Sequence, residues 1–437
     1  MKIPGLNNVN QGIQTFILCF LIAPLIFMVG PKRWNPKLKG SFTKAHASDF
    51  TLDRWWSGYF QDEFEDWIND HIGLRAWFVK ANYQYDYSLF DTLHTAAVLR
   101  GKENYFYETN YVRTHKGLDF IGQSTIQRRV ETLSEIRQYL KENNSELLII
   151  LAPGKGSFYP NYFPESYDTI PGQLPTNYSV FKEVLSQTDI PTLDFHSWFL
   201  EMKDTTSHAL FPNTGIHWSR YGALLAADSI LKLLPHLTLK PSPQLHLFDF
   251  EKTRNTRFVD DDLEKSLNLV FDLPHLEMTY PQFQFSKRNK KMDSKVVTIA
   301  DSYFWDMFNF GLATNALNGG EFWYYNKQVY PASYTKNTLL DSSYYQNIHE
   351  NDVVMLMCTD ANLFKFPFGF DKDMAPPIQK IKKEKAALRL TKTIERIYNT
   401  EKWINSLKEE AKQKAIPLDQ HVRENAEYVI WKEDNQK

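Results

Sequence analysis

A buried strand that stops at a serine is indicated by Val296-Val297-Thr298-Ile299-Ala300-Asp301-Ser302-Tyr303. Its opening run of apolar or β-branched residues is typical of a strand inside a parallel sheet. Reactive groups in open α/β sheets collect just beyond the carboxyl ends of the strands. Ser302 is therefore a candidate nucleophile, and its backbone N–H is a candidate donor to an oxyanion. The alternative is that Asp301 and Ser302 only cap the following helix, since both residue types are favoured at helix N-termini.

A serine is a weak nucleophile without a base, and the best candidate base is His217. It lies in Gly215-Ile216-His217-Trp218-Ser219, just before a helix that the apolar spacing predicts from about Tyr221 to Leu234, with Pro235 as its stop. A loop that leads into a core-packed helix is a rigid mounting for a base. A packing or surface role is the alternative, because the chain contains 12 histidines.

The composition excludes several classes of protein. The 437 residues suffice for about two or three domains. The net charge of −2 provides no basic field for nucleic acid. Cys19 lies in an apolar run and is not expected to pair with Cys358, so neither a disulfide nor a zinc motif of cysteine type is expected. We expect neither a metal ion nor a cofactor.

The N-terminal stretch from Ile13 to Gly30 is almost wholly apolar and long enough to cross a bilayer as a helix. A single-pass anchor is favoured over a cleaved signal peptide, because the run is long and no small-x-small cleavage site follows it cleanly. The amino-terminal side carries only Lys2, whereas the far side carries Lys32, Arg33, Lys37 and Lys39. Taken literally, the positive-inside rule would place the following domain in the cytoplasm.

The domain organisation follows from a switch in periodicity. A helix predicted over Thr125 to Asn143 is followed by an apolar strand at Leu147 to Leu151, which is the α/β signature. We therefore expect the following segments: an anchor at 1–31, a linker at 32–48, a helical and hairpin region at 49–120 that packs on the core, an α/β domain at 121–370 with an irregular insertion at about 237–294, and a helical tail at 371–437.

The predicted strand at 147–151 is followed by Ala152-Pro153-Gly154-Lys155-Gly156-Ser157. This run lacks the spacing of a phosphate-binding loop. Lys155 still follows the end of a strand, where its charge would favour an anionic group. A solvated loop lysine is the alternative.

Together these motifs resemble the SGNH hydrolase-like proteins of bacterial polysaccharide O-acetylation, the AlgJ/AlgX type. The matching elements after the anchor are Asp70-His71-x-Gly73-Leu74-Arg75, Gly101-Lys102-Glu103-Asn104-Tyr105-Phe106, Ala152-Pro153-Gly154-Lys155, His217-Trp218 and Ala300-Asp301-Ser302. The resemblance implies an SGNH-like α/β/α sandwich with a small, mostly parallel sheet, preceded by a transmembrane helix.

The resemblance also implies a function. Ser302 would take an acetyl group as an ester, with His217 as its base, and a polysaccharide hydroxyl would then accept the group. A membrane-bound O-acyltransferase would supply the acetyl group, and the domain would face the periplasm from a single-pass anchor in a bacterial inner membrane, against the flanking charges. Asp301 is a further catalytic candidate. The candidates for substrate binding are Lys155, Trp218 and Tyr303.

One departure concerns the carboxylate of the triad. The family pattern is Asp-x-His-Trp, whereas this chain has Gly215 in place of the aspartate. Loss of the orienting aspartate costs on the order of 10⁴ in turnover in a protease triad. Three explanations remain open: His217 is oriented by Asn213, by a backbone carbonyl or by a distant carboxylate such as Asp194 or Asp360; the site is a slow dyad; or it is inactive.

Three functions are therefore compatible with the sequence. The leading one is a membrane-anchored, periplasm-facing O-acetyltransferase that acts on a polysaccharide. An esterase with the same site chemistry differs only in using water as the acceptor. A non-catalytic glycan-binding or assembly subunit of a polysaccharide export machinery is the third, and Gly215 is its main support.

Overall fold

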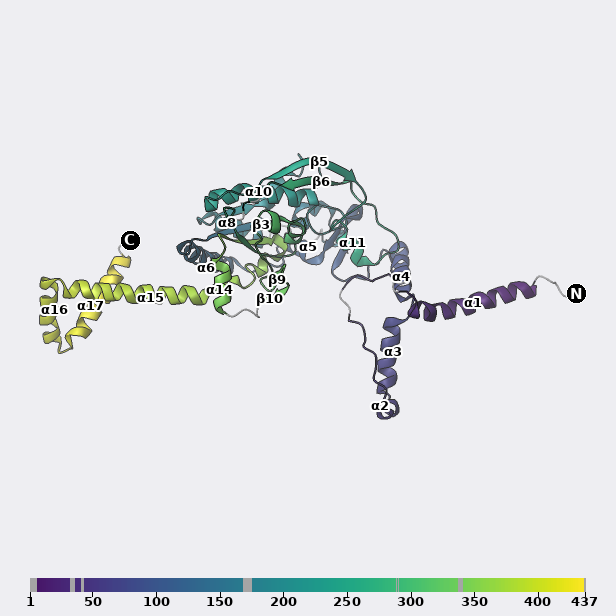
Figure 1. Ribbon diagram of the computed structural model, residues 1–437, viewed down its shortest axis with the longest axis horizontal. Coiled ribbons are helices and arrows are strands. Elements are labelled where there is room, and N and C mark those ends of the chain that lie inside the picture. The colour runs from purple at the N-terminus through teal and green to yellow at the C-terminus, as the bar shows by residue number, and fades with distance from the viewer. Residues whose placement is uncertain are drawn as a thin grey trace.

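A seven-stranded sheet forms the centre of the computed structural model (Figure 1), which describes residues 6–31, 36–40, 43–167, 175–287, 289, 291–336 and 341–435. The strand order is β10-β9-β8-β7-β11-β3-β4. The five strands from β8 to β4 are parallel, and β9 and β10 extend the sheet in antiparallel fashion. The strands are β3 (Glu146–Ala152), β4 (Thr192–Asp194), β7 (Val296–Ala300), β8 (Phe322–Tyr324), β9 (Gln328–Tyr330), β10 (Tyr334–Thr335) and β11 (Val353–Thr359).

Helices cover both faces of this sheet. Successive side chains of a strand point to opposite faces, so Val296 and Ala300 of β7 belong to one core cluster, whereas Val297 and Ile299 belong to the other. The first face packs against α9 (Phe195–Met202), α10 (Arg220–Thr238), α12 (Phe304–Asn309) and α13 (Leu312–Asn315). The second packs against α6 (Gln123–Glu142), α8 (Asn177–Ser186), α14 (Asp341–His349) and the start of α15 (Phe370–Tyr398). The expected α/β/α sandwich is confirmed.

Two differences from the expected elements lie between residues 220 and 294. Helix α10 does not stop at Pro235 but continues to Thr238, so a proline in the last turn, which cannot donate a backbone hydrogen bond, does not end this helix. The segment 237–294, expected to be irregular, contains the antiparallel strands β5 (Leu245–Thr253) and β6 (Met278–Phe285), with α11 (Asp262–Leu267) between them. These strands were not recognised in the sequence because a register shift in β5 and Pro281 within β6 obscure the alternation of apolar and polar residues that is typical of a strand.

The N-terminal part begins with α1 (Leu6–Val29). Among the described helices, α1 alone is long and apolar enough to cross a membrane, over Gln11–Val29. The flanking residues Lys2, Lys32 and Arg33 lie outside the described residues. The elements that follow are α2 (Leu52–Trp56), α3 (Tyr59–His71), α4 (Arg75–Phe90), the hairpin of β1 (Val98–Arg100) and β2 (Phe106–Glu108), and α5 (Thr109–His115). The short α7 (Lys155–Phe158) comes later and directly follows β3.

Not all of the region 49–120 lies against the core. Val98, Phe106 and Tyr111 belong to the core cluster on the first face of the sheet. In contrast, α2 and α3, which the structure describes in full, bury no residue. These two helices project away from the body of the molecule (Figure 1).

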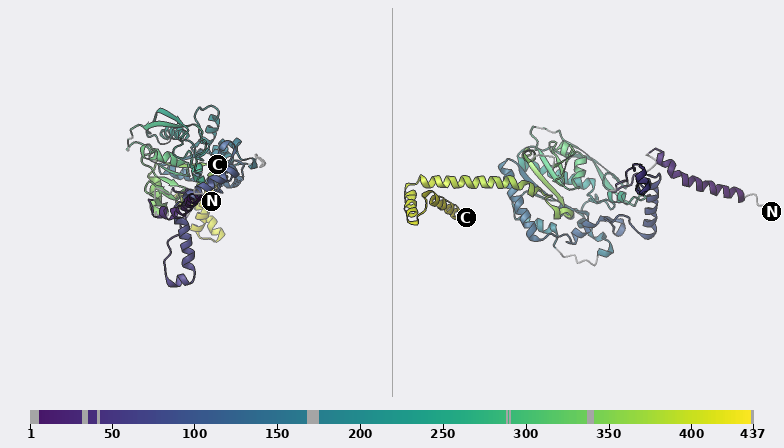
Figure 2. Two further views of the ribbon diagram at one scale, coloured as in Figure 1. Left: turned by 90° about the vertical axis from the view of Figure 1, so that its right-hand side faces the viewer. Right: turned by 90° about the horizontal axis from the view of Figure 1, so that it is seen from below.

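The C-terminal tail is helical. Helix α15 leaves the body of the molecule, and α16 (Glu401–Lys414) and α17 (Leu418–Asn435) fold back beside it (Figures 1 and 2). Ile397, Leu407 and Val422 form part of a small separate core that joins these helices. Beyond Ile381, the described part of the tail contributes no residue to the two core clusters of the sheet.

Candidate active site

Ser302 lies in the turn that follows β7, at the carboxyl end of the parallel strands. It is partly exposed, and its Oγ is 3.0 Å from Nε2 of His217. The neighbouring Asp301 is fully buried, and its Oδ2 accepts hydrogen bonds from the backbone N–H and the hydroxyl of Thr359, at 2.9 and 2.7 Å, and from Asn362. Its Oδ1 accepts the N–H of Tyr303. Asp301 therefore fixes the serine turn to β11 and does not contact His217.

His217 has a carboxylate partner that lies far away in the sequence. Its Nδ1 is 2.5 Å from Oδ2 of Asp262, the first residue of α11, and Oδ1 of Asp262 accepts the backbone N–H of Ile216 at 2.9 Å. An ionised carboxylate only accepts, so Nδ1 carries the proton and Nε2 is free to accept the proton of Ser302. Ser302, His217 and Asp262 thus have the connectivity of a serine–histidine–carboxylate triad.

Gly215 makes room for the segment that carries Asp262. A Cβ at position 215 would lie 2.6 Å from the carbonyl oxygen of Val259 and 2.7 Å from that of Asp260, closer than real Cβ contacts allow. The adjoining Thr214 donates its hydroxyl to the same Asp260 carbonyl at 3.3 Å. The glycine that removes the expected aspartate therefore also lets the backbone of residues 259–260 approach and deliver another aspartate.

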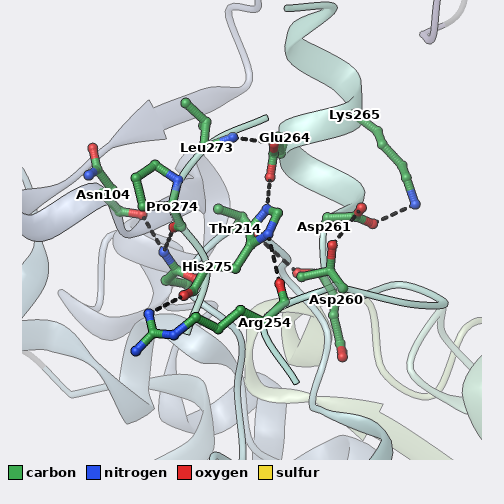
Figure 3. Close-up of polar contacts among 12 residues, drawn as sticks. Asn104, Thr214, Arg254, Asp260, Asp261, Glu264, Lys265, Leu273, Pro274 and His275 are labelled. Carbon is green, nitrogen blue, oxygen red and sulfur yellow. Dashed lines mark hydrogen bonds and ion pairs between the residues drawn. The ribbon is translucent and has the colours of Figure 1, made fainter. Parts of the chain in front are cut away.

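A polar network holds α11 in this position (Figure 3). The N–H of Glu264 donates to the carbonyl of Thr214 at 3.1 Å, and the Glu264 carboxylate accepts the N–H of Leu273 at 2.7 Å. Nε2 of His275 lies 2.5 Å from the other carboxylate oxygen of Glu264. Because Glu264 follows Asp262 by two residues, this network fixes the start of α11 under the His217 loop.

The environment of His217 has opposing effects on its pKa. Burial would lower the pKa of His217, but the charge of Asp262 and its hydrogen bond outweigh burial and hold the pKa above the ordinary value. Glu108, at the end of β2, adds to the rise in the pKa of His217, and burial raises the pKa of Glu108 itself. The imidazolium that forms when His217 takes a proton is therefore stabilised.

A second contact joins the loops that carry the two reacting groups. Arg220, in the first turn of α10, donates to the carboxylate of Asp306 in α12 at 2.7 Å. Burial raises the pKa of Asp306, against the opposing effect of Arg220. Since α10 follows His217 and α12 follows Ser302, this buried ion pair helps to set the distance between the serine and the histidine.

A substrate-binding or solvated lysine was expected at position 155, on the open edge of the sheet. Lys155 does not lie there. Its side chain is fully buried, and Nζ donates to the carbonyl oxygens of Asn213 and Gly215, each at 2.7 Å. Burial lowers the pKa of Lys155 well below its ordinary value. Lys155 therefore supports the backbone of the His217 loop, and the interpretation as a substrate contact is corrected.

The two aromatic candidates for substrate binding are also part of the core. Trp218 and Tyr303 are both 0% exposed, and their rings lie 5.3 Å apart. The hydroxyl of Tyr303 donates to the carbonyl of Ile216 at 2.8 Å. Both residues therefore pack the His217 loop against the serine turn, and neither is accessible to a substrate.

None of the named candidates orients His217. The side chain of Asn213 donates to the carbonyl of Pro274 and accepts the N–H of Leu276. Asp194 caps α9, and Asp360 contacts His196 and Ser157. The general explanation, a distant carboxylate, was open from the sequence, but the residue is Asp262. Its only sequence signal was an acidic run before Leu263, which is typical of a helix N-terminus.

The described residues contain no group of three or more His, Cys, Asp or Glu side chains placed to hold a metal ion. What the geometry offers is an activated hydroxyl, a base and a carboxylate at the carboxyl edge of a parallel sheet. The arrangement is an α/β/α sandwich whose serine, histidine and aspartate are hydrogen-bonded in series.

A family comparison agrees with this class. Residues 98–297 match the family described as SGNH hydrolase-like domain, acetyltransferase AlgX. The match confirms the resemblance seen in the sequence motifs over these residues. The matched range contains His217 and Asp262 and ends before Ser302.

Similar solved structures include the O-acetyltransferase domain of AlgJ from Pseudomonas putida, with 15% identity and a TM-score of 0.42 over 64% of this chain and 98% of that one. PatB1 from Bacillus cereus, with a sulfonyl adduct, has 11% identity and a TM-score of 0.41 over 62% and 99% of the two chains. AlgX from Pseudomonas aeruginosa has 14% identity and a TM-score of 0.39 over 63% and 67%. No curated protein sequence gives a significant match.

Proposed function

We propose that the protein is an O-acetyltransferase in which Ser302 is the nucleophile, His217 the general base and Asp262 the residue that orients His217. One observation carries the proposal: His217 is hydrogen-bonded through Nε2 to Ser302 and through Nδ1 to Asp262. The matched family, which is described as an acetyltransferase, favours acetyl transfer over other acyl chemistry.

In the first half-reaction, His217 Nε2 takes the proton of Ser302 Oγ as that oxygen attacks the carbonyl carbon of the acetyl donor. Asp262 stabilises the imidazolium that forms. The backbone N–H of Ser302 donates to the oxyanion. The imidazolium then gives its proton to the leaving group, and the acetyl group remains on Ser302 as an ester.

In the second half-reaction, a hydroxyl of the acceptor attacks the acetyl-serine ester. His217 takes the proton of that hydroxyl and then returns it to Ser302 Oγ as the ester bond breaks. One acetyl group is transferred, and the enzyme returns to its starting protonation state. The same steps with water as the acceptor would be those of an esterase.

The acceptor and the location form the finer part of the proposal. We infer that the acceptor is a hydroxyl of an exopolysaccharide or cell-surface glycan, and that α1 anchors the domain to the outer side of a bacterial inner membrane. The acetyl donor would be supplied by a membrane-bound O-acyltransferase. The resemblance to polysaccharide O-acetylation proteins supports this location, because a glycan-modifying domain must be where the polymer is.

An acceptor-dependence assay separates transferase from esterase. Detergent-solubilised full-length protein is mixed with a chromogenic acetyl ester, with and without a polysaccharide acceptor, and both released acetate and acetylated polymer are measured. A transferase moves acetyl groups to the polymer at the expense of free acetate, whereas an esterase releases acetate regardless of polymer. A Ser302→Ala variant is the matched control for both readouts.

A reporter fused to the C-terminus tests the location. A reporter that is active only outside the cytoplasm is expected to be active. Activity of a reporter that works only in the cytoplasm would exclude the periplasmic placement.

A further inference from the structure

Helices α2 to α4, referred to below as the α2–α4 segment (residues 52–90), expose many large apolar side chains. Soluble proteins rarely expose contiguous apolar patches of this kind unless something covers them. The most informative of these residues, with the exposed fraction of each, are Trp56 (82%), Tyr59 (67%), Phe64 (42%), Phe78 (46%), Tyr85 (56%) and Leu89 (63%). We therefore expect the apolar surface of this segment to be covered by a partner or by a membrane.

Helix α4 has two faces with different partners. One face is bound to the body of the molecule, because Lys80 donates to the carbonyl of Leu269 at 3.0 Å and Gln84 accepts the backbone N–H groups of residues 270 and 271 at 3.1 Å. At 100° per residue, the opposite face carries Phe78, Tyr85 and Leu89. This second face therefore points away from the catalytic body.

The outward face of α4 meets the apolar helix α1. The ring of Phe78 lies 6.0 Å from that of Phe20 in an edge-to-face arrangement. At the turn between α3 and α4, a Cβ on Gly73 would clash with the backbone at Pro24 and Met28, so this turn packs directly on the last turns of α1. Helices α3 and α4 run across the direction of α1 at its C-terminal end (Figures 1 and 2).

Helix α3 is amphipathic and acidic. Phe60, Phe64 and Trp67 stack along one side with ring centroids 5.7 and 5.8 Å apart. The remaining surface carries Asp62, Glu63, Glu65, Asp66 and Asp70. A helix of this kind can lie in the plane of a membrane interface with its apolar side toward lipid and its charged side toward water.

We propose that the α2–α4 segment lies in the headgroup layer of the bilayer, on the side where α1 ends, with Phe64, Tyr85 and Leu89 toward the lipid. The proposal rests on the membrane anchoring by α1 proposed above. Continuity with α1 favours a bilayer over a protein partner, because a membrane-spanning α1 brings the outward face of α4 to the membrane surface. Tyr and Trp are also enriched at this depth.

The charge of α3 makes the proposal more specific. Its acidic side is repelled by anionic lipids, so the interaction depends on apolar and aromatic contacts and not on surface charge. The segment therefore binds lipids with zwitterionic headgroups. These contacts hold the catalytic body at a fixed distance from the membrane surface.

Nitroxide labels on single cysteines test the proposal in the full-length protein, reconstituted in phosphatidylcholine nanodiscs. The native Cys19 is exposed on α1 and reports its depth, whereas Cys358 is fully buried and is not expected to react. In a Cys19→Ser background, Phe64→Cys and Tyr85→Cys place labels on the proposed lipid side, and Glu65→Cys is the matched control on the acidic side of α3. The accessibility of each nitroxide to oxygen is compared with its accessibility to a water-soluble nickel complex, and the comparison gives the depth of the label. Ester hydrolysis by each variant is measured separately to confirm that it is folded.

The expected result is a deep label at Cys19, labels at interfacial depth at positions 64 and 85, and a water-exposed label at position 65. Labels at 64 and 85 that are as water-exposed as the one at 65 would overturn the proposal and favour a protein partner. A deep label at Cys19 in that case would still support α1 as a membrane-spanning anchor. Interfacial labels at 64 and 85 with a water-exposed Cys19 would support surface binding and contradict the spanning anchor. Replacing part of the lipid with phosphatidylglycerol is expected to move the labels at 64 and 85 outward, and deeper labels would contradict the role given to the acidic side.

Discussion

Asp262 Oδ2 lies 2.5 Å from His217 Nδ1, although 45 residues separate them in the chain. The carboxylate that orients the histidine therefore comes from α11, between the two strands of the β5–β6 hairpin. The family pattern would place it two residues before the histidine. Gly215 at that position lets the backbone of residues 259–260 fill the space. One glycine therefore leaves out the expected aspartate and also makes room for the segment that leads to Asp262.

The first prediction concerns Asp262 itself. Asp262→Asn removes the charge that stabilises the imidazolium, and kcat is expected to fall by on the order of 10⁴, as for the aspartate of a protease triad. The measurement is acetyl-ester turnover by the solubilised protein. Asp261→Asn is the matched control, since Asp261 pairs with Lys265 and does not contact His217. Comparable turnover in the Asp262 variant and the control would contradict the role of Asp262.

The pH dependence of turnover follows from the pKa of His217. Only the neutral imidazole accepts the serine proton, and the pKa of His217 lies above its ordinary value of 6.5. The rate should therefore rise with pH through a midpoint above 6.5. In Asp262→Asn, burial acts on the pKa of His217 without that opposing charge, so the midpoint of the residual activity should move to lower pH. An unchanged pH midpoint in Asp262→Asn would show that Asp262 does not raise the pKa of His217.

Gly215 provides a steric prediction. Because the Cβ alone would clash with the carbonyls of Val259 and Asp260, Gly215→Ala should displace Asp262 and lower turnover about as much as Gly215→Asp does. Restoring the family aspartate should therefore not restore or increase activity. Turnover and thermal unfolding of both variants provide the measurement. An active Gly215→Ala variant would show that the close approach is not required.

Lys155 is expected to act as a positioning residue. Lys155→Met leaves the carbonyl of Gly215 without its buried donor, which costs about 1–3 kcal/mol, whereas the carbonyl of Asn213 keeps the N–H of Phe106 as a donor. Because these carbonyls belong to the His217 loop, kcat for an acetyl ester should fall while KM stays near the wild-type value. A higher KM with unchanged kcat would indicate instead that Lys155 contributes to substrate binding.

Asp260 predicts a pH-dependent stability. It is 1% exposed, and burial raises its pKa to about 7, although Oδ2 accepts the hydroxyl of Tyr280 at 2.7 Å. In the unfolded chain it ionises near 3.8, so folding stability should fall as pH rises from about 4 to 7, by about 1.4 kcal/mol per unit. Asp260→Asn should remove this loss, and its advantage in thermal unfolding over the wild type should grow across that range. A constant difference would exclude Asp260 as the cause.

The sequence predicted those parts of the structure that depend on local patterns. The strands β3, β7 and β11 are continuous apolar runs, and α6 has a clear apolar face, so each could be placed before the structure was known. Ser302 and His217 could be named because one ends a strand and the other precedes a core helix.

The remaining parts depend on contacts between distant residues. Nothing near His217 indicates Asp262, because their contact requires the fold of the whole β5–β6 segment. Lys155 looked like a loop lysine because the carbonyls that it binds are 58 and 60 residues away. Trp218 and Tyr303 were candidates for substrate binding, but they pack on each other inside the first core cluster.

The intact mass of the full-length protein after incubation with an activated acetyl ester tests whether Ser302 carries the acetyl group. Wild type, Ser302→Ala and His217→Ala are compared, with Ser157→Ala as a control at a serine that contacts Asp360 and not His217. We expect one added acetyl group in the wild type and in Ser157→Ala, and none in the other two variants. An acetyl group that persists in Ser302→Ala, or that never forms on the wild type, would contradict the assignment of Ser302 as the nucleophile.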